Sequence, residues 1–160
     1  MPISTEQKPI LVLDWDETLI LSAPAEWFTD YQPTDRQLIL TIDRNGYPGT
    51  MRLFQRPHLL KFLETVSRRY VLYLWSYGVR DYIQQGLDAL DLRSFFADRV
   101  IVREDMTARY KDLWQLSKGA ALNTTAILDD NPSHFGVLNP HNCILIPPYR
   151  RPNDHDKALE

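Results

Sequence analysis

The sequence predicts an α/β fold with a central parallel sheet, helices on both faces and a small antiparallel β insertion. Short continuous apolar runs recur along the chain, as expected for strands that are buried on both faces of a sheet. Amphipathic segments with helical spacing separate these runs. Strands that alternate with helices are typical of βαβ units, which build parallel sheets. Only the proline- and glycine-containing segment 23–55 interrupts this alternation.

The predicted strands of the parallel sheet are short runs of aliphatic or aromatic residues. They are Ile10–Leu13, Val71–Trp75, Val100–Val102, Ala126–Leu128 and Ile144–Ile146. Each run has the length of a strand and is too short to be a buried helix.

Three helices are predicted between these strands. After Pro57, whose missing N–H suits a first helical turn, residues 59–66 place apolar side chains three and four positions apart. The same spacing in residues 82–90 predicts a second helix, and a weaker pattern predicts a third over Asp112–Gly119.

The segment 23–55 predicts the antiparallel insertion. Leu38–Ile42 is predicted to be a strand, and residues 43–46 carry an Asn-Gly turn signal. Thr50–Phe54 is then expected to be the returning strand, paired with Leu38–Ile42. The insertion is too short for an independent domain or a large cap. We therefore expect a single domain over residues 1–160 with a site open to solvent, and a frayed polar segment at 150–160.

Size, charge and cysteine content exclude several classes of protein. The chain has 160 residues, 44% hydrophobic and 24% charged, as in ordinary globular domains. Because 18 Lys and Arg oppose 21 Asp and Glu, a broad basic surface for nucleic acid is disfavoured. The single cysteine excludes an internal disulfide. No run approaches the roughly 20 apolar residues of a membrane span and no secretory signal is visible, so we expect a cytoplasmic protein.

Polar residues that can carry chemistry follow the predicted strands. They are Asp14 and Asp16 after the first strand, Ser76 after the second, and Asp129 and Asp130 after the fourth. Lys111 lies in the connection that precedes the fourth strand. Open parallel sheets bind ligands at the carboxyl ends of their strands, near the reversal in strand order. The sequence therefore predicts a site at that edge of the sheet.

The segment Asp14–Thr18 offers two carboxylates two positions apart. One carboxylate can attack phosphorus, while the other protonates the leaving oxygen and later removes a proton from water. A short Asp-x-Asp-x-Thr pattern equally suits a helix N-cap or a surface loop, because Asp and Thr favour both places.

The other candidates also have ordinary structural explanations. Ser76 at a strand end and Asp129–Pro132 are both typical of turns, and Lys111 is typical of a solvated charge. The four histidines show no metal-ligand spacing, so we assign them no catalytic role. Trp15 alternates with its two acidic neighbours in an extended strand and is expected to pack in the core.

Taken in order, these residues resemble the motifs of the haloacid dehalogenase superfamily. The resemblance is closest to its carboxy-terminal-domain phosphatase branch, which is related to the phosphatases that act on the tail of RNA polymerase II. It extends from Pro9 to Tyr149 and is carried by Leu13–Leu19, Arg56–His58 with Phe62-Leu63, Ser76, Tyr110–Leu113, Ile127–Pro132 and Asn139–Asn142. It implies a Rossmann-like fold without a large cap. At the position of Trp15 a smaller aliphatic residue is common in the family.

The resemblance implies a Mg²⁺-dependent phosphatase that forms an aspartyl-phosphate. Asp14 would be the nucleophile and a metal ligand, and Asp16 the general acid and base, with its backbone carbonyl on the metal. Asp129 and Asp130 would hold Mg²⁺, which prefers oxygen ligands.

The same resemblance assigns the residues that contact the substrate phosphate. Thr18 would orient the loop there, Ser76 would hydrogen-bond a phosphoryl oxygen, and Lys111 would bind the phosphate and offset its growing charge.

The expected substrate is a phosphorylated protein or peptide, carrying phosphoserine or phosphothreonine as is usual for the family, while phosphotyrosine stays open as an alternative. Nothing in the sequence suggests a cap that would enclose a small metabolite. Several aromatic residues can line a phosphopeptide site or belong to the core, namely Trp27, Phe28, Tyr31, Trp75 and Tyr77. Two alternatives stay open: a small-molecule or nucleic-acid-end phosphatase with the same chemistry, and a non-catalytic binding module on the same fold.

Overall fold

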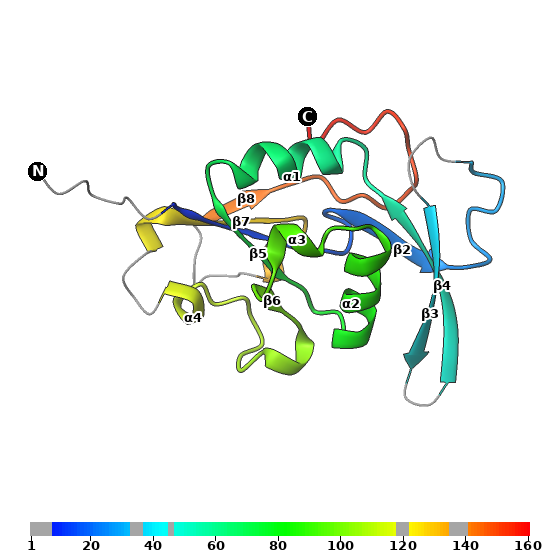
Figure 1. Cartoon of the computed structure of the whole chain (residues 1–160), viewed down its shortest axis with the longest axis horizontal. Coiled ribbons are helices and arrows are strands. Elements are labelled where there is room, and N and C mark those ends of the chain that lie inside the picture. Colours follow the sequence, from blue (N-terminus) through cyan, green and yellow to red (C-terminus); the bar gives the residue numbers. More distant parts are fainter. Residues whose placement is uncertain (1–7, 33–36, 45–46, 118–121, 135–140) are drawn as a thin grey trace, which may run out of the picture.

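The computed structural model describes residues 8–32, 37–44, 47–117, 122–134 and 141–160. Its strands form a five-stranded central sheet and a separate three-stranded sheet (Figure 1). The central strands are β1 (Ile10–Leu13), β5 (Val71–Trp75), β6 (Val100–Ile101), β7 (Thr125–Asp129) and β8 (Cys143–Leu145). The small sheet contains β2 (Ile20–Pro24), β3 (Gln37–Arg44) and β4 (Tyr47–Gln55).

The central sheet is parallel, with the strand order β6-β5-β1-β7-β8. From β1 the chain continues to β5 and β6 on one side, and then crosses to β7 and β8 on the other. Leu13 at the end of β1 pairs with Leu74 and with Leu128. The residues that follow β1, β5 and β7 therefore meet at one edge, at the point where the strand order reverses. The predicted fold class is confirmed.

The helices are α1 (Leu59–Ser67), α2 (Arg80–Ala89), α3 (Arg93–Phe96) and α4 (Trp114–Ser117). α1 begins two residues after Pro57 because His58 has a left-handed φ of 67° and cannot belong to the first turn. α3 was not predicted, since four residues are too few to show a period. Residues 118–119 of the third predicted helix lie outside the described part. In that part, no helix combines the length and apolar character needed to cross a bilayer.

Alternating side chains of the central strands supply two cores. Leu11 and Leu13 of β1 belong to a large cluster with apolar residues of α1, α2 and α3. Val12 between them belongs to a second cluster with Ile127 and with Leu113, which directly precedes α4. Figure 1 shows α1 and α4 on opposite sides of the central strands. Both faces of the sheet are thus covered, as the uninterrupted apolar runs require.

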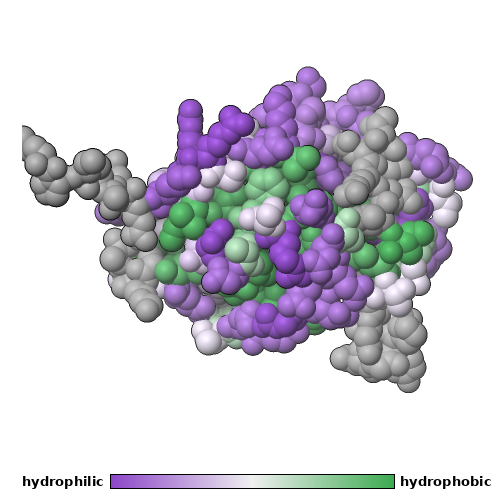
Figure 2. All heavy atoms as spheres, in the orientation of Figure 1, coloured by the Kyte–Doolittle hydropathy of each residue, from purple (hydrophilic) through white to green (hydrophobic). Residues whose placement is uncertain are grey.

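The small sheet is antiparallel, with β4 between β2 and β3. The predicted strands at 38–42 and 50–54 are present, and their Asn45-Gly46 turn lies outside the described residues. The sheet begins at Ile20 rather than Ala23, because β2 follows β1 after a short loop and pairs with β4. Figure 2 shows a hydrophobic area over this sheet, and β3 exposes Ile39. The insertion therefore starts directly beside the carboxyl end of β1.

The segment 150–160 is packed, so the prediction that it frays is wrong. Leu159 is 3% exposed and joins the larger core. Asp156 pairs with the buried guanidinium of Arg56, with Oδ1 2.8 Å from Nε. Two contacts hold the segment, one from Leu159 and one from the pair of Asp156 with Arg56. The polar composition of the segment gave no sign of either contact.

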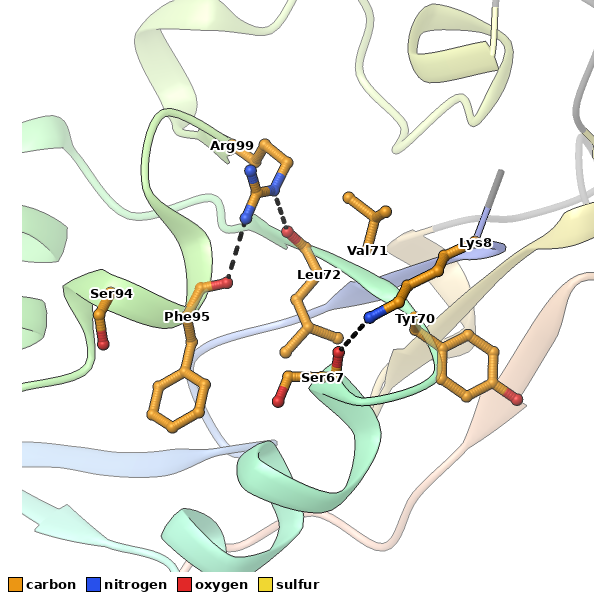
Figure 3. A pocket seen from close by; sticks show the side chains of 8 residues that line it. All are labelled: Lys8, Ser67, Tyr70, Val71, Leu72, Ser94, Phe95 and Arg99. Carbon is orange, nitrogen blue, oxygen red and sulfur yellow. Dashed lines mark hydrogen bonds between the residues drawn. The ribbon is translucent and has the colours of Figure 1, made fainter. Parts of the chain in front are cut away.

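The opposite edge of the central sheet contains a cavity of about 420 Å³ between the starts of β5 and β6 and the ends of α1 and α3 (Figure 3). Two cations line it. Lys8 Nζ donates to the carbonyl of Ser67 at 3.3 Å, and Arg99 Nε donates to the carbonyl of Leu72 at 2.9 Å. Ser67 is the last residue of α1, where carbonyl groups have no helical partner. Both cationic side chains therefore act as donors to backbone carbonyl groups.

Candidate active site

The loop after β1 is tight and carries the first part of the site. The N–H of Asp14 donates to the carbonyl of Leu128 at 3.0 Å, so Asp14 extends the pairing of β1 with β7. Glu17 has a φ of 60°, and the N–H groups of Leu19 and Ile20 both donate to the carbonyl of Trp15. This turn sends the chain directly into β2.

The side chain of Thr18 connects this loop to the loop after β7. Its Oγ1 lies 3.1 Å from Asp14 Oδ2 and 3.3 Å from Asp130 Oδ1, and it accepts the backbone N–H of Asp130 at 3.1 Å. Thr18 is completely buried. Two acidic loops that are more than 100 residues apart in the sequence are thus held together by one hydroxyl group.

Lys111 lies between the carboxylates of two different loops. Its Nζ is 2.5 Å from Asp14 Oδ1 and 2.6 Å from Asp129 Oδ2, and the side chain has no exposed surface. Its backbone N–H donates to the carbonyl of His134 at 2.8 Å. Burial alone would lower the pKa of Lys111, but the charges of Asp14 and Asp129 outweigh it and raise this pKa. Lys111 is therefore an ammonium ion at neutral pH.

Asp129, at the end of β7, lies among several hydrogen-bond donors. Its Oδ1 accepts the N–H of Asn131 at 2.9 Å and lies 3.0 Å from His134 Nδ1. Burial raises the pKa of Asp129, but the bonds from His134 and Lys111 outweigh it, so that the pKa lies below its ordinary value. Asp129 is ionised.

The remaining carboxylates of this cluster have raised pKa values. Burial raises the pKa of Asp14 more than the charge of Lys111 lowers it. Burial and the charges of Asp14 and Asp129 raise the pKa of Asp130 to about 6. One ammonium group thus contacts the carboxyl groups of Asp14 and Asp129, Asp130 lies nearby as a third, and the cluster carries a surplus of negative charge.

This surplus and the types of ligand atom fit a hard divalent cation. Asp14, Asp129 and His134 each offer a ligand atom, and these atoms lie within 4.8 Å of one another. Carboxylate oxygens are the ligands that Mg²⁺ prefers, together with water and phosphate. A ring nitrogen is a poorer ligand for Mg²⁺, and the bond from His134 to Asp129 suits it to orienting that carboxylate.

Asp16 lies apart from the Lys111 cluster and has other partners. Its Oδ1 accepts the hydroxyl groups of Tyr82 in α2 and of Ser22 in β2, the latter at 3.1 Å. Burial raises the pKa of Asp16 to about 6, against the opposing effect of the bond from Tyr82. A carboxyl group with such a pKa can both give and take a proton near neutral pH.

Comparison with known proteins adds the family to this geometry. Residues 9–160 match the family described as NLI interacting factor-like phosphatase. The chain belongs to this phosphatase family. It is 32% identical over 159 residues to a CTD nuclear envelope phosphatase 1 homolog of Caenorhabditis elegans. That match covers 94% of this chain and 63% of that protein. It is also 30% identical over 158 residues to the mitochondrial import inner membrane translocase subunit TIM50 of Phytophthora infestans, covering 98% and 32% respectively.

Solved structures agree with the family. A point variant of the fission yeast RNA polymerase II CTD phosphatase Fcp1, bound to beryllium fluoride, superposes with a TM-score of 0.74 at 25% identity. That match covers 89% of this chain and 42% of Fcp1. A haloacid dehalogenase-like hydrolase from Xanthomonas campestris shares the fold at 9% identity, with a TM-score of 0.54 over 95% of this chain and 90% of that one. The chain spans less than two thirds of the length of the curated relatives named above.

In this family member, Ser76 lies at the end of β5, beside the loop that carries Asp14. It is 1% exposed, and its Oγ accepts the N–H of Gly78 at 2.9 Å. Tyr77 follows, with Lys111 Nζ 5.5 Å from the centre of its ring and the ring of His134 at 4.6 Å. Tyr77 therefore lies next to the acidic cluster.

The other aromatic residues that can line a phosphopeptide site divide between different places. Trp75 is fully buried in the second core. Phe28 and Tyr31 pack edge-on against Phe54 under the small sheet, and Trp27 is exposed beside Phe28. Of the five, Tyr77 is the one with a ring contact to the Lys111 cluster among the residues that the structure describes.

Proposed function

We propose that this family member is a Mg²⁺-dependent phosphomonoester hydrolase that works through an aspartyl-phosphate on Asp14. The observation that carries the proposal is the buried Lys111, held between the carboxylates of Asp14 and Asp129. An ammonium group and a surplus of carboxylates at the carboxyl edge of a parallel sheet suit a dianionic phosphate together with a divalent cation. The family match supports the same reaction.

Asp14, Asp129 and Asp130 would hold Mg²⁺ through their carboxylates, and Asp16 through its backbone carbonyl. When bound, the ion offsets the repulsion between the Asp14 carboxylate and the substrate dianion. Lys111 would add a point charge beside the same phosphate, and Ser76 would donate its hydroxyl to a phosphoryl oxygen. Thr18 keeps the two acidic loops in register, as its contacts to Asp14 and Asp130 support.

The reaction has two balanced steps. A carboxylate oxygen of Asp14 attacks phosphorus, the bond from phosphorus to the ester oxygen breaks, and Asp16 gives its proton to that oxygen. A water molecule then attacks the phosphorus of the aspartyl-phosphate and gives a proton to Asp16. The bond to Asp14 breaks, which releases inorganic phosphate and restores both carboxyl groups.

The substrate we propose is phosphoserine or phosphothreonine in a protein. Three observations support it: the small insertion in place of a large cap, the half-exposed Tyr77 beside Lys111, and relatives named as CTD phosphatases. Specificity constants (kcat/KM) on phosphopeptides, sugar phosphates and 3′-phosphorylated oligonucleotides test this choice. Higher values on a sugar or an oligonucleotide would replace the protein substrate.

A binding module is the second candidate, because the relative from Phytophthora infestans is named as a translocase subunit. The cluster of Lys111 with Asp14 and Asp129 favours the enzyme, since its surplus of carboxylates suits a divalent cation and its ammonium group suits a phosphate. The compartment remains the cytoplasm by prediction, whereas the relative from Caenorhabditis elegans is named for the nuclear envelope. Imaging of the tagged protein in its host cell separates these two locations.

The decisive experiment compares the wild type with Asp14→Asn, which removes the nucleophile's charge and little volume. We expect turnover to fall on the order of 10⁴-fold or more, with unchanged circular dichroism. Asp98→Asn, at a strongly exposed carboxylate, is the matched control and should leave turnover unchanged. EDTA should stop the wild-type reaction, and added Mg²⁺ should restore it. Turnover by Asp14→Asn equal to the wild type, or full activity in EDTA, would contradict the proposal.

A further inference from the structure

Asp16 is held by hydroxyl groups from two separate elements. Tyr82 belongs to α2 and Ser22 to β2, and both hydroxyl groups donate to the same carboxylate oxygen, Oδ1. Tyr82 is buried. Within the described part of the chain, every hydrogen bond recorded for this carboxylate ends on Oδ1. Oδ2 is thus left for another partner.

We infer that Tyr82 and Ser22 are positioning residues that fix Oδ1 of Asp16 as an acceptor and leave Oδ2 as the oxygen that gives and takes the proton. This inference rests on the proposed role of Asp16 as the general acid and base. A protonated carboxyl group has one carbonyl-type oxygen and one hydroxyl. Because Oδ1 already accepts two O–H groups, the proton belongs on Oδ2.

The chemistry of the two donors suits this role. A cationic partner would orient the carboxylate but would also stabilise its ionised form, which makes a poor proton donor. Neutral hydroxyl groups orient the carboxylate without supplying a charge. The hydroxyl of Tyr82 keeps its own proton at neutral pH, because a phenol ordinarily has a pKa of about 10.

A glycine in α2 brings Tyr82 within reach of Asp16. Gly86 lies one turn after Tyr82, against the indole of Trp15, and a Cβ at Gly86 would lie 2.8 Å from Trp15 Cζ2. Glycine is less favourable inside a helix than alanine, and the close approach to Trp15 explains its use at this position. The contact of Gly86 with Trp15 and that of Tyr82 with Asp16 fix α2 against consecutive residues of the same loop.

Tyr82→Phe tests the inference with two substrates. The serine oxygen of a phosphoserine peptide needs a proton when it leaves, whereas the nitrophenolate of p-nitrophenyl phosphate leaves without one. General acid catalysis contributes roughly 10²–10⁴-fold, and a misplaced acid loses part of it. We expect kcat/KM on the peptide to fall about tenfold, with a much smaller change on p-nitrophenyl phosphate. Ser22→Ala should act in the same direction and more weakly.

Tyr70→Phe is the matched control, because Tyr70 lies at the opposite edge of the sheet beside the cavity of Figure 3. It should match the wild type on both substrates. An equal loss on both substrates in Tyr82→Phe, or a change in KM alone, would overturn the inference. If Tyr82→Phe does not fold, Ser22→Ala supplies the same comparison between substrates.

Asp16→Asn separates the inference from the proposal beneath it. If Asp16→Asn is inactive on the peptide and Tyr82→Phe matches the wild type, only the positioning role is wrong. If Asp16→Asn itself matches the wild type, the assignment of the general acid is wrong and the inference falls with it.

Discussion

Lys111 and Arg56 are both cations without exposed side-chain surface, and both contact the loop Asp14–Thr18. Their surroundings differ in charge. Lys111 faces two carboxylates in its immediate contacts. Arg56 faces one carboxylate, Asp156, and otherwise backbone carbonyls.

The contacts of Arg56 form a balanced structural set. Its Nη1 donates to the carbonyl of Thr18 at 3.0 Å, and its Nη2 donates to the carbonyl of Pro147 at 2.8 Å. Asp156 matches its single charge, and the guanidinium lies 5.3 Å from the ring centre of Tyr149. This arrangement ties the C-terminal segment to the loop that carries the nucleophile we propose, and it needs no further ligand.

The Lys111 cluster is unbalanced by comparison. Asp130 adds a third carboxyl group beside Asp14 and Asp129, and the pKa of Asp14 and of Asp130 are both raised, chiefly by burial. Burial of a surplus of one sign of charge costs free energy unless a ligand of the opposite charge balances it. The comparison teaches that the imbalance of a buried charged cluster, rather than burial of a cation, marks the site that takes a ligand.

Among the substitutions that test the difference between Lys111 and Arg56, Lys111→Met should have the largest effect. Loss of a preorganised charge at the phosphate lowers kcat on the order of 10³-fold. The variant also leaves Asp14 and Asp129 without their shared cation, so Mg²⁺ should raise its melting temperature more than that of the wild type. Kinetics and thermal unfolding with and without Mg²⁺ measure both effects. Lys61→Met, at an exposed position on α1, is the control, and equal kcat in both variants would contradict the role of Lys111.

Arg56→Met should mainly affect stability. Breaking a buried pair leaves Asp156 and two carbonyl groups without their donor, which costs about 3 kcal/mol of unfolding free energy. Mg²⁺ should stabilise Arg56→Met no more than it stabilises the wild type, because the Lys111 cluster is the same in both and the surroundings of Arg56 offer only the single carboxylate of Asp156. Arg150→Met is the control, since the pair of Arg150 with Glu17 is exposed, screened by solvent and of little consequence for stability. Urea unfolding with and without Mg²⁺ measures both variants, and a larger gain from Mg²⁺ in Arg56→Met than in the wild type would contradict the difference between the two cations.

The sequence could predict the fold because its signals are continuous in the chain. The apolar runs gave the parallel strands, and the residues that follow them lie at one edge because parallel strands end together. That rule brings Asp14 and Asp129 close without knowledge of any contact. The connection that contains Lys111 showed no comparable pattern, and the motif resemblance alone placed this lysine at the site.

Other parts of the site depend on partners that the sequence does not pair. Tyr82 has the helical spacing of a core residue, and no pattern links it to Asp16. His134 lacks ligand spacing because its partner, Asp129, is a carboxylate that it orients. Trp15 packs as predicted, but the space for its indole comes from Gly86, in a helix some 70 residues away.

The smallest expected effect concerns the pH dependence of stability in the metal-free protein. The pKa of Asp16 and of Asp130 are about 6 in the folded protein, above the ordinary value near 3.8. Such groups stabilise the fold when protonated, and this contribution is fully present below the unfolded pKa and lost as pH rises through about 6. Metal-free protein should therefore lose on the order of 2 kcal/mol of unfolding free energy between pH 4 and 7, mostly from the buried Asp16, because solvent screens the more exposed Asp130.

Asp156 should show the opposite dependence. Although burial opposes it, the bond from Arg56 holds the pKa of Asp156 below its ordinary value, so its contribution is present above that value and lost as pH falls through the folded pKa. Urea unfolding in EDTA across pH 3–7 measures both dependences of the unfolding free energy on pH. Asp130→Asn should reduce only the loss of stability between pH 4 and 7, and Asp156→Asn should reduce only the loss of stability at acid pH. A wild-type stability that rises steadily to pH 7, unchanged by Asp130→Asn, would show that the Lys111 cluster carries no surplus charge and that the two buried cations are equivalent.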